Sequence, residues 1–472
     1  MRRTKIVCTI GPASASPETL DALVSAGMDV ARLNFSHGSH AEHAEVIRRL
    51  REREGRWKKP VAILQDLQGP KVRLGTFAGG SAVVASGQPF TLTPEPCLGT
   101  AARATISHPE LVGVLKAGDP IWLGDGMVQL RVDAVEGEEI RCRVVAGGTL
   151  SDHKGVSFPR LAVPVSCLTD KDRQDLTFGI QHGVDYVAVS FVRSAADIQE
   201  VRKFLHQHGA DVPVVAKLER GEAVANLPEI LALVDAVMVA RGDLGMDVPL
   251  EEVPIIQKEV IRRARLAKVP VIVATQMLES MATHPRPTRA EVSDVATAIF
   301  DGADAIMLSA ETATGQHPVE AVEVMGRIAE RAEQSLPLKH VDRRRQEVYG
   351  FPGAISDAAC HAARTLKARA IVAFTQSGFT ARLISHERPE VPVIALTPDV
   401  AVQRRLALFW GVSSRLIRKV ETTDEMIEEV EATLLGDGSV KPDDVLVIIS
   451  GAPMWVTGTT NLLKLHRVGE RR

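Results

Sequence analysis

Residues 235–249 read DAVMVARGDLGMDVP and join an apolar strand to a charged end. The first part of this stretch, Ala236 to Ala240, is apolar throughout, as a parallel strand covered on both faces must be. The strand then runs directly into Arg241, Gly242 and Asp243. Because a buried strand needs no charge at its tip, these residues indicate that the end of the strand faces a polar ligand.

The same pattern recurs along the chain. Apolar runs occur early at 5–10, 30–35 and 61–66, and later at 186–191, 214–219, 237–242, 271–276 and 305–310. Amphipathic segments between them predict helices. Residues 1–69 and 165–338 supply about 240 residues, close to the ~250 of a (β/α)8 TIM barrel. An open Rossmann-like sheet shows the same alternation, but the strand count and the length favour the barrel.

Two further domains are expected. Residues 70–164 contain short alternating runs broken by Gly, Pro and Asp-Gly turns, which predict a small β-barrel inserted after the third barrel strand. Residues 351–472 return to βα alternation, with strand-like runs at 370–375, 391–397, 415–420 and 444–450, and predict a C-terminal doubly wound α/β domain. The polar stretch 339–353 is expected to link this domain to the barrel.

Composition excludes several classes of protein. The net charge is −3 and aromatic residues make up 4%, which argues against nucleic-acid binding and attraction to acidic membranes. Five dispersed cysteines and the lack of a ~20-residue apolar run predict a reduced, cytoplasmic protein. The sequence has neither a Walker A motif nor a dinucleotide fingerprint.

The strand ends carry polar groups at an unusual density. In a barrel the carboxyl ends of all strands meet at one face, where chemistry occurs. One such residue is commonly a helix cap or a solvated loop residue, but the whole set predicts a polar ligand and a metal. The set is Arg32, Asn34, Ser36, Asp66, Lys217, Glu219, Arg241, Asp243, Thr275, Gln276, Ser309 and Glu311.

The tripeptide at 217–219 supplies a cation, Lys217, and a carboxylate, Glu219. Lys217 and Glu219 are two residues apart in a strand, so both side chains enter the mouth, where Asp243 can join Glu219. Two carboxylates without nitrogen or sulfur ligands suit Mg²⁺ or Mn²⁺. The alternative is a Lys217–Asp243 ion pair without a metal. Gly242 allows close backbone approach to a ligand, and Arg241 is expected to brace the loop.

Three histidines in this region could be mistaken for a zinc site. His37, His40 and His43 lie three apart, but no acid is placed to join them, so a solvated helix start is the better interpretation. His37 alone is expected to face the site.

Nine motifs along nearly the whole chain resemble those of the pyruvate kinase family. They are TKIVCTIGPAS, ARLNFSHG, QDLQGPKVR, KGVSFP, AKLE, MVARGDLG, ATQMLESM, PRPTRAEVSDVA and DGADAIMLSAETA. The resemblance implies phosphoryl transfer from phosphoenolpyruvate to ADP, giving pyruvate and ATP, with the inserted domain closing as a lid. It also implies a homotetramer.

The resemblance assigns roles residue by residue. Lys217, Arg32 and Thr275 would be catalytic, and Gly242 and Asp243 would join them in binding substrate. Glu219 and Asp243 would hold Mg²⁺ or Mn²⁺, and Asn34, His37, Arg73 and Lys154 would contact the nucleotide.

One departure concerns the monovalent cation. Many members of the family need K⁺ and carry Thr-Lys-Gly-Pro-Glu after the Asp of the third strand, whereas this chain has Leu67-Gln-Gly-Pro-Lys71. The Lys71 ammonium can supply the charge of K⁺, so K⁺ is expected not to be required, although Asn34, Ser36 and Asp66 still match the cation site.

The C-terminal domain contains a candidate effector site. Thr375, Ser377, Gly378 and Thr380 lie between a strand and a helix, where hydroxyls and free N–H groups can bind phosphate. An ordinary helix cap explains the local pattern equally well. In the family this loop holds an effector phosphate, and no Arg is evident at 450–461 for a second one, so AMP or a sugar monophosphate is expected.

Two other functions fit part of this pattern. A metal-dependent lyase or aldolase acting on pyruvate-type substrates would use similar carboxylates but would not need Arg73 and Lys154. A catalytically inactive sugar-phosphate sensor would be expected to lack Lys217 or Glu219, and both are present.

Overall fold

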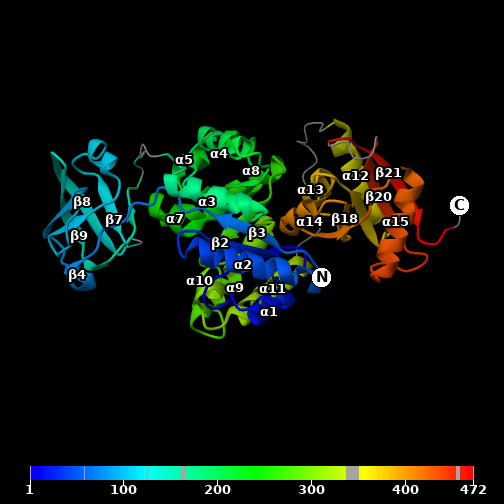
Figure 1. The fold of residues 1–472 in the computed structure, drawn as a ribbon, viewed down its shortest axis with the longest axis horizontal. Helices are drawn as coiled ribbons and strands as arrows, with labels where there is room; N and C mark the ends of the chain where they lie inside the picture. Colours follow the sequence, from blue (N-terminus) through cyan, green and yellow to red (C-terminus); the bar gives the residue numbers. More distant parts are fainter. Residues whose placement is uncertain are drawn as a thin grey trace.

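The computed structural model describes residues 2–57, 59–124, 126–159, 161, 166–335, 350–452 and 458–470. The chain forms three parts in a row (Figure 1): an all-β part built from β4 to β11 at one end, a central barrel, and an α/β part from α12 onward at the other end. Among the described residues no helix is both long and apolar enough to cross a membrane.

The central part is a closed parallel barrel of eight strands, which confirms the predicted (β/α)8 fold. The strand order around the barrel is β1-β16-β15-β14-β13-β12-β3-β2. The strands are β1 (Lys5–Thr9), β2 (Val30–Asn34), β3 (Ala62–Asp66), β12 (Tyr186–Val189), β13 (Val214–Leu218), β14 (Ala236–Ala240), β15 (Val271–Ala274) and β16 (Ala305–Leu308). The predicted strand at 237–242 is wrong at its end, because Arg241 and Gly242 already belong to a helix, α7.

Helices surround the barrel, and several begin at strong capping signals. Ser39 and Thr169 each form a capping box, with Glu42 and Asp172 respectively. The helices are α1 (Pro17–Ala26), α2 (His40–Arg53), α3 (Asp170–Gln181), α4 (Ala195–Gln207), α5 (Gly221–Ala225), α6 (Leu227–Leu231), α7 (Arg241–Asp247), α8 (Val253–Leu266), α9 (Arg289–Asp301), α10 (Ala310–Ala313) and α11 (Pro318–Ser335).

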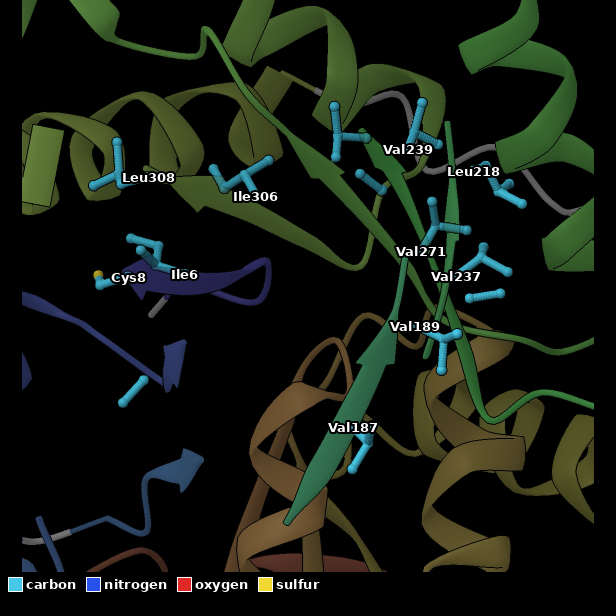
Figure 2. Close-up of a cluster of buried hydrophobic side chains, with 14 of the residues drawn as sticks. Ile6, Cys8, Val187, Val189, Leu218, Val237, Val239, Val271, Ile306 and Leu308 are labelled. Carbon is cyan, nitrogen blue, oxygen red and sulfur yellow. The ribbon is translucent and has the colours of Figure 1, made fainter. Parts of the chain in front are cut away.

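Each barrel strand faces two different environments. Side chains such as Ile6, Val237 and Ile306 point outward and pack under the helices (Figure 2), in one large cluster of buried apolar residues. Their neighbours along the strands, such as Val7 and Met238, point inward and form a second, smaller cluster. The strand period of two therefore fixes which residues reach the interior.

One close approach fixes α3 against β3. Gln65 at the end of β3 is fully buried and donates through Nε2 to the Asp175 carbonyl of α3 at 2.6 Å. A Cβ on Gly179 would lie only 2.0 Å from Gln65 Oε1, so glycine is required there. This contact holds the strand that carries Asp66.

The C-terminal domain closes the amino-terminal end of the barrel. Ala407 and Leu408 join the inward-facing cluster, and the Tyr186 hydroxyl donates to the Arg405 carbonyl at 2.6 Å. Lys5 Nζ donates to the Val412 carbonyl at 2.7 Å. The C-terminal domain therefore packs against this end of the barrel, opposite the polar strand ends.

The inserted domain is all-β, as predicted, and has its own apolar core. Its strands are β4 (Ser81–Val84), β5 (Pro89–Thr93), β6 (Arg103–Thr105), β7 (Pro120–Leu123), β8 (Val128–Glu136), β9 (Glu139–Ala146), β10 (Gly148–Ser151) and β11 (Val156–Ser157). They pair into a six-stranded sheet and a two-stranded sheet, so the expected small barrel consists of two sheets around one core.

The C-terminal domain has a five-stranded sheet of order β19-β18-β17-β20-β21, with apolar clusters on both faces. This confirms the doubly wound fold. Its elements are α12 (Gly350–Thr365), β17 (Ala370–Phe374), α13 (Phe379–His386), β18 (Val393–Thr397), α14 (Val400–Arg405), β19 (Val412–Leu416), α15 (Thr423–Gly436), β20 (Val445–Gly451) and β21 (Thr460–Arg467).

Three details of this domain differ from the sequence-based expectation. Residues 350–353, expected in the linker, begin α12, while most of the linker at 339–349 lies outside the described residues. The strand expected at 415–420 lies three residues earlier, as β19. The antiparallel edge strand β21 was not predicted, because its side chains lack an apolar run.

Candidate active site

A buried ion network lies at the centre of the barrel mouth. Arg32, Asp66 and Lys217 all point inward, because each follows inward-facing apolar residues of its strand. Asp66 Oδ2 accepts a hydrogen bond from Arg32 Nε at 2.6 Å, and its other oxygen lies 3.2 Å from Lys217 Nζ. Arg32 also donates to Thr9 Oγ1 at 2.9 Å. One carboxylate thus holds two cations in fixed positions.

Charge pairing keeps these groups ionised despite burial. Burial alone lowers the pKa of the Lys217 ammonium, but Asp66 and Glu219 more than offset this effect, so that pKa lies above its usual value. Burial raises the pKa of the Asp66 carboxyl, but Arg32 and Lys217 hold it below its usual value. Lys217 is therefore a fixed positive charge rather than a proton donor at neutral pH.

Glu219 lies beside Lys217, as the sequence predicts. Its Oε1 is 2.7 Å from Lys217 Nζ, and its Oε2 accepts a hydrogen bond from the Phe191 N–H at 2.8 Å. The side chain is almost fully buried. Burial raises the pKa of this carboxyl, Lys217 opposes that change, and the negative charge of Asp243 adds to it. The two carboxylates are thus close enough to repel each other.

Asp243 and Glu219 line one cavity of about 70 Å³. A cavity of this size has room for several water molecules. Its other walls come from the barrel and from the inserted domain, including Lys71, Ser157 and Arg193. Asp243 Oδ1 lies 3.6 Å from Lys71 Nζ.

The donor set fits a hard divalent cation. Glu219 Oε1 and Asp66 Oδ1 are buried and lie 2.7 Å and 3.2 Å from Lys217 Nζ. Carboxylates such as Glu219 and Asp243 at one cavity are the ligand type that suits Mg²⁺ or Mn²⁺, which also bind water and substrate oxygens. No group of three or more His, Cys, Asp or Glu side chains placed to hold a metal occurs among the described residues. The site at Glu219 and Asp243 stays a prediction.

The alternative Lys217–Asp243 ion pair is not formed. Lys217 pairs with Asp66 and Glu219 instead, while Asp243 pairs with Lys71 from the inserted domain. The physical reason is position: Lys217 lies on the inner wall of the barrel, and Asp243 lies in α7, above the strand end.

Arg241 braces the loop, as expected. Its guanidinium donates to the Thr275 carbonyl at 2.6 Å and pairs with Asp294 at 2.7 Å. The Gly242 N–H donates to Thr275 Oγ1 at 2.9 Å. The Gly242 N–H, expected to lie close to a ligand, is therefore bonded to Thr275 in this structure. Thr275 itself has a left-handed backbone conformation, with φ of 69°.

The four predicted nucleotide residues lie along the rim. Burial, followed by the charges of Arg73, Lys71 and Arg32, lowers the pKa of His37, so these basic groups are near one another. Arg73 pairs in a β-bridge with Gly155, next to Lys154, and donates to the His153 carbonyl at 3.0 Å. Asn34, at the end of β2, accepts a hydrogen bond from the Ser36 N–H at 3.2 Å.

The predicted monovalent-cation residues divide into two groups. Asn34 and Asp66 are neighbours on paired strands, and Ser36 follows in the same loop. Lys71 lies apart from them, with Asp243 as its ion-pair partner.

The interpretation of the histidine cluster as a solvated helix start is confirmed for His37 and His40, which are exposed where α2 begins, and is wrong for His43. His43 is buried and stacks on Phe35, with ring centroids 4.1 Å apart. His40 Nε2 lies 2.7 Å from the buried Asp175 carboxylate, which also pairs with Lys171. These contacts anchor the loop that carries Ser36 and His37, because Lys171 also donates to the Phe35 carbonyl at 2.7 Å.

The candidate effector loop is partly occupied by internal contacts. Gly378 has a φ of 86° and precedes α13, and Ser377 is exposed. Thr375 is buried, and the Thr380 hydroxyl forms a 2.8 Å hydrogen bond with Thr460 Oγ1. Residues 453–457 of the late loop lie outside the described residues.

Two site residues were missed. The Ser190 hydroxyl lies 2.7 Å from Lys217 Nζ and donates to the Leu67 carbonyl at 2.8 Å, and Thr9 contacts Arg32. Ser190 continues the inward alternation of Tyr186 and Ala188, so strand periodicity could have identified it.

Comparison with known proteins gives the same family along the chain. The family model described as "Pyruvate kinase, barrel domain" matches residues 1–322, and "Pyruvate kinase, alpha/beta domain" matches residues 353–466. The chain is 47% identical to the pyruvate kinase of Mycobacterium tuberculosis over 473 residues, covering 99% of each.

More distant relatives agree. The chain is 46% identical to the pyruvate kinase of Geobacillus stearothermophilus, covering 99% of this chain and 81% of the relative. The crystal structure of a pyruvate kinase from Cryptosporidium parvum superposes with a TM-score of 0.92 at 34% identity, covering 99% of this chain and 96% of the other. The chain therefore belongs to the pyruvate kinase family.

Proposed function

We propose that the chain transfers the phosphoryl group of phosphoenolpyruvate to ADP, giving pyruvate and ATP. The observation that carries this proposal is the placement of two fixed cations, Arg32 and Lys217, beside two carboxylates that share one cavity. Phosphoryl transfer depends on positioning and on neutralising the oxygens of the migrating group, and these are what the site supplies.

Arg32 and Lys217 act on the phosphoryl group itself. An ADP oxygen attacks phosphorus while the bond from phosphorus to the enol oxygen breaks, so negative charge spreads over the three phosphoryl oxygens. Lys217 stays protonated because of Asp66 and Glu219, and Arg32 is held by Asp66 and Thr9. Neither cation has to move or change its charge during transfer, which is the preorganisation that lowers the barrier.

Glu219 and Asp243 would hold Mg²⁺ or Mn²⁺. The bound ion supplies Lewis-acid stabilisation of the enolate oxygen. The role of the protein is to keep both carboxylates at one cavity, with the Phe191 N–H orienting Glu219 at 2.8 Å.

Gly242 and Thr275 would bind the substrate carboxylate. In this structure the Gly242 N–H donates to the Thr275 hydroxyl, and an incoming carboxylate oxygen can replace that hydroxyl as the acceptor. The enolate is then protonated at carbon, and solvent near Thr275 supplies the proton.

Asn34, His37, Arg73 and Lys154 would hold the nucleotide between the barrel and the inserted domain. Arg73 and Lys154 lie on the two chain segments that join these domains. Closure of the inserted domain over ADP would exclude water, which would otherwise accept the phosphoryl group.

We also propose that catalysis does not require K⁺. The Lys71 ammonium lies at the mouth and contributes to lowering the pKa of His37, so its positive charge acts on a group other than Asp243.

An effector with one phosphate, AMP or a sugar monophosphate, would bind the loop at Thr375, Ser377, Gly378 and Thr380. The exposed Ser377 and the left-handed Gly378 support this assignment.

The Lys217→Met variant tests the central role of the ammonium. In a coupled assay for pyruvate from phosphoenolpyruvate, ADP and Mg²⁺, we expect turnover to fall by about 10³-fold or more, the range seen when a transition-state cation is removed from a phosphoryl-transfer site. Lys203→Met, on the exposed side of α4, is the matched control and should retain full turnover. A wild-type chain that forms no pyruvate, or a Lys217→Met variant as active as the control, would refute the proposal.

Exchange of the monovalent salt tests independence from K⁺. With Na⁺ or Tris salts in place of K⁺ at equal ionic strength, we expect turnover to stay within about twofold, because Lys71 carries the required charge within the protein. A large drop that K⁺ alone restores would show that the monovalent site is still used.

An activation screen tests the effector site. At subsaturating phosphoenolpyruvate, we expect AMP or a sugar monophosphate to raise the rate more than fructose 1,6-bisphosphate does. If no phosphorylated compound raises the rate, this loop is not an effector site.

A further inference from the structure

Each carboxylate of the proposed divalent-cation site has a lysine beside it. Glu219 Oε1 lies 2.7 Å from Lys217 Nζ, and Asp243 Oδ1 lies 3.6 Å from Lys71 Nζ. The two lysines differ in how firmly they are held. Lys217 is buried and fixed by Asp66 and Ser190, whereas the side chain of Lys71 is 31% exposed. Lys71 is therefore the lysine that an incoming ion can displace from its carboxylate.

Lys71 also comes from a different domain. It lies in the segment that leaves the barrel for the inserted domain, where its N–H donates to the Gly69 carbonyl at 2.8 Å. A Cβ on Gly155, in the returning segment, would lie 3.4 Å from Lys71 Cε, so the Lys71 stem runs along that backbone. Its ammonium then extends to Asp243 in α7 of the barrel. The pair is a direct link between the inserted domain and the barrel mouth.

The negative charges of Glu219 and Asp243 explain why a positive group beside Asp243 is stabilising. Asp243 raises the pKa of the buried Glu219 through its negative charge, so the two carboxylates destabilise each other. Lys217 already offsets Glu219, and the Lys71 ammonium is the positive group placed to offset Asp243.

We propose that Lys71 is a tethered substitute for the divalent cation: its ammonium neutralises Asp243 before the ion binds, and the ion must displace it. The inference rests on the proposed function, in which Glu219 and Asp243 are the metal ligands. It gives Lys71 a second role, distinct from that of replacing K⁺. It also means that divalent binding breaks the ion pair between the inserted domain and α7.

The test is direct titration of Mn²⁺ into the full-length enzyme without phosphoenolpyruvate or ADP, with free Mn²⁺ measured by electron paramagnetic resonance. Because part-exposed ion pairs contribute about 0.2–1 kcal/mol, we expect Lys71→Met and Lys71→Gln to bind Mn²⁺ about 1.4-fold to fivefold more tightly than the wild type. Lys71→Arg keeps the positive charge and should stay close to the wild type.

Lys116→Met is the matched control. It removes the same charge from the same domain, and Lys116 is exposed and forms no ion pair among the residues that the structure describes, so Mn²⁺ affinity should not change. Unchanged or weaker Mn²⁺ binding in both neutral Lys71 variants would overturn the inference, and so would an equal gain in Lys116→Met.

One further variant separates this inference from the proposed function. Glu219→Gln should weaken Mn²⁺ binding in every background. If Glu219→Gln leaves the affinity unchanged, the metal site itself is wrong and both proposals fall. If it weakens binding while the Lys71 variants match the wild type, only the substitute role of Lys71 is lost.

Discussion

A single buried carboxylate, Asp66, holds the two cations on which the chemistry depends. It pairs with Arg32 at 2.6 Å and Lys217 at 3.2 Å, and the side chains of all three residues are at most 10% exposed. Removing one partner of such a pair typically costs about 3–5 kcal/mol, because the charge left behind stays buried. Each charge in this network therefore depends on its partners for stability. The network holds the Arg32 and Lys217 cations in place at the barrel mouth before any substrate binds.

The rest of the structure positions this network. Strand alternation turns Arg32, Asp66 and Lys217 inward, while the opposite faces of the same strands pack under the helices. The C-terminal domain packs Ala407 and Leu408 against the inward-facing residues at the amino-terminal end of the barrel. The inserted domain follows β3 and brings Lys71 to Asp243 at the carboxyl end. These two domains therefore contact opposite ends of the barrel.

Much of this could be predicted from the sequence, because it depends on local periodicity. The eight barrel strands are apolar and short, and the spacing of Lys217 and Glu219 fixes them on one face of β13. The edge strand β21 could not be identified, because five of its eight residues are polar and its sheet position, not its composition, makes it a strand. The partner of Lys71 could not be predicted either, because it depends on the angle between two domains rather than on any local pattern.

The Gly242–Thr275 contact shows a different limit. The sequence indicates a backbone donor at Gly242, but not that the Thr275 hydroxyl accepts from it at 2.9 Å. Thr275 makes that contact from a left-handed conformation, which β-branched residues rarely adopt. Such strain is typical of functional positions, and the Arg241 guanidinium donates to the carbonyl of the same residue at 2.6 Å.

We expect the fixed cations and the two carboxylates proposed as metal ligands to act on the same substrate molecule. Anomalous diffraction from crystals soaked with Mn²⁺ and a phosphoenolpyruvate analogue measures this directly. We predict one strong Mn²⁺ peak within bonding distance of Glu219 and Asp243, with the phosphoryl oxygens facing Lys217 Nζ and the Arg32 guanidinium. A peak that avoids either carboxylate, or a phosphoryl group bound away from Lys217, would contradict it.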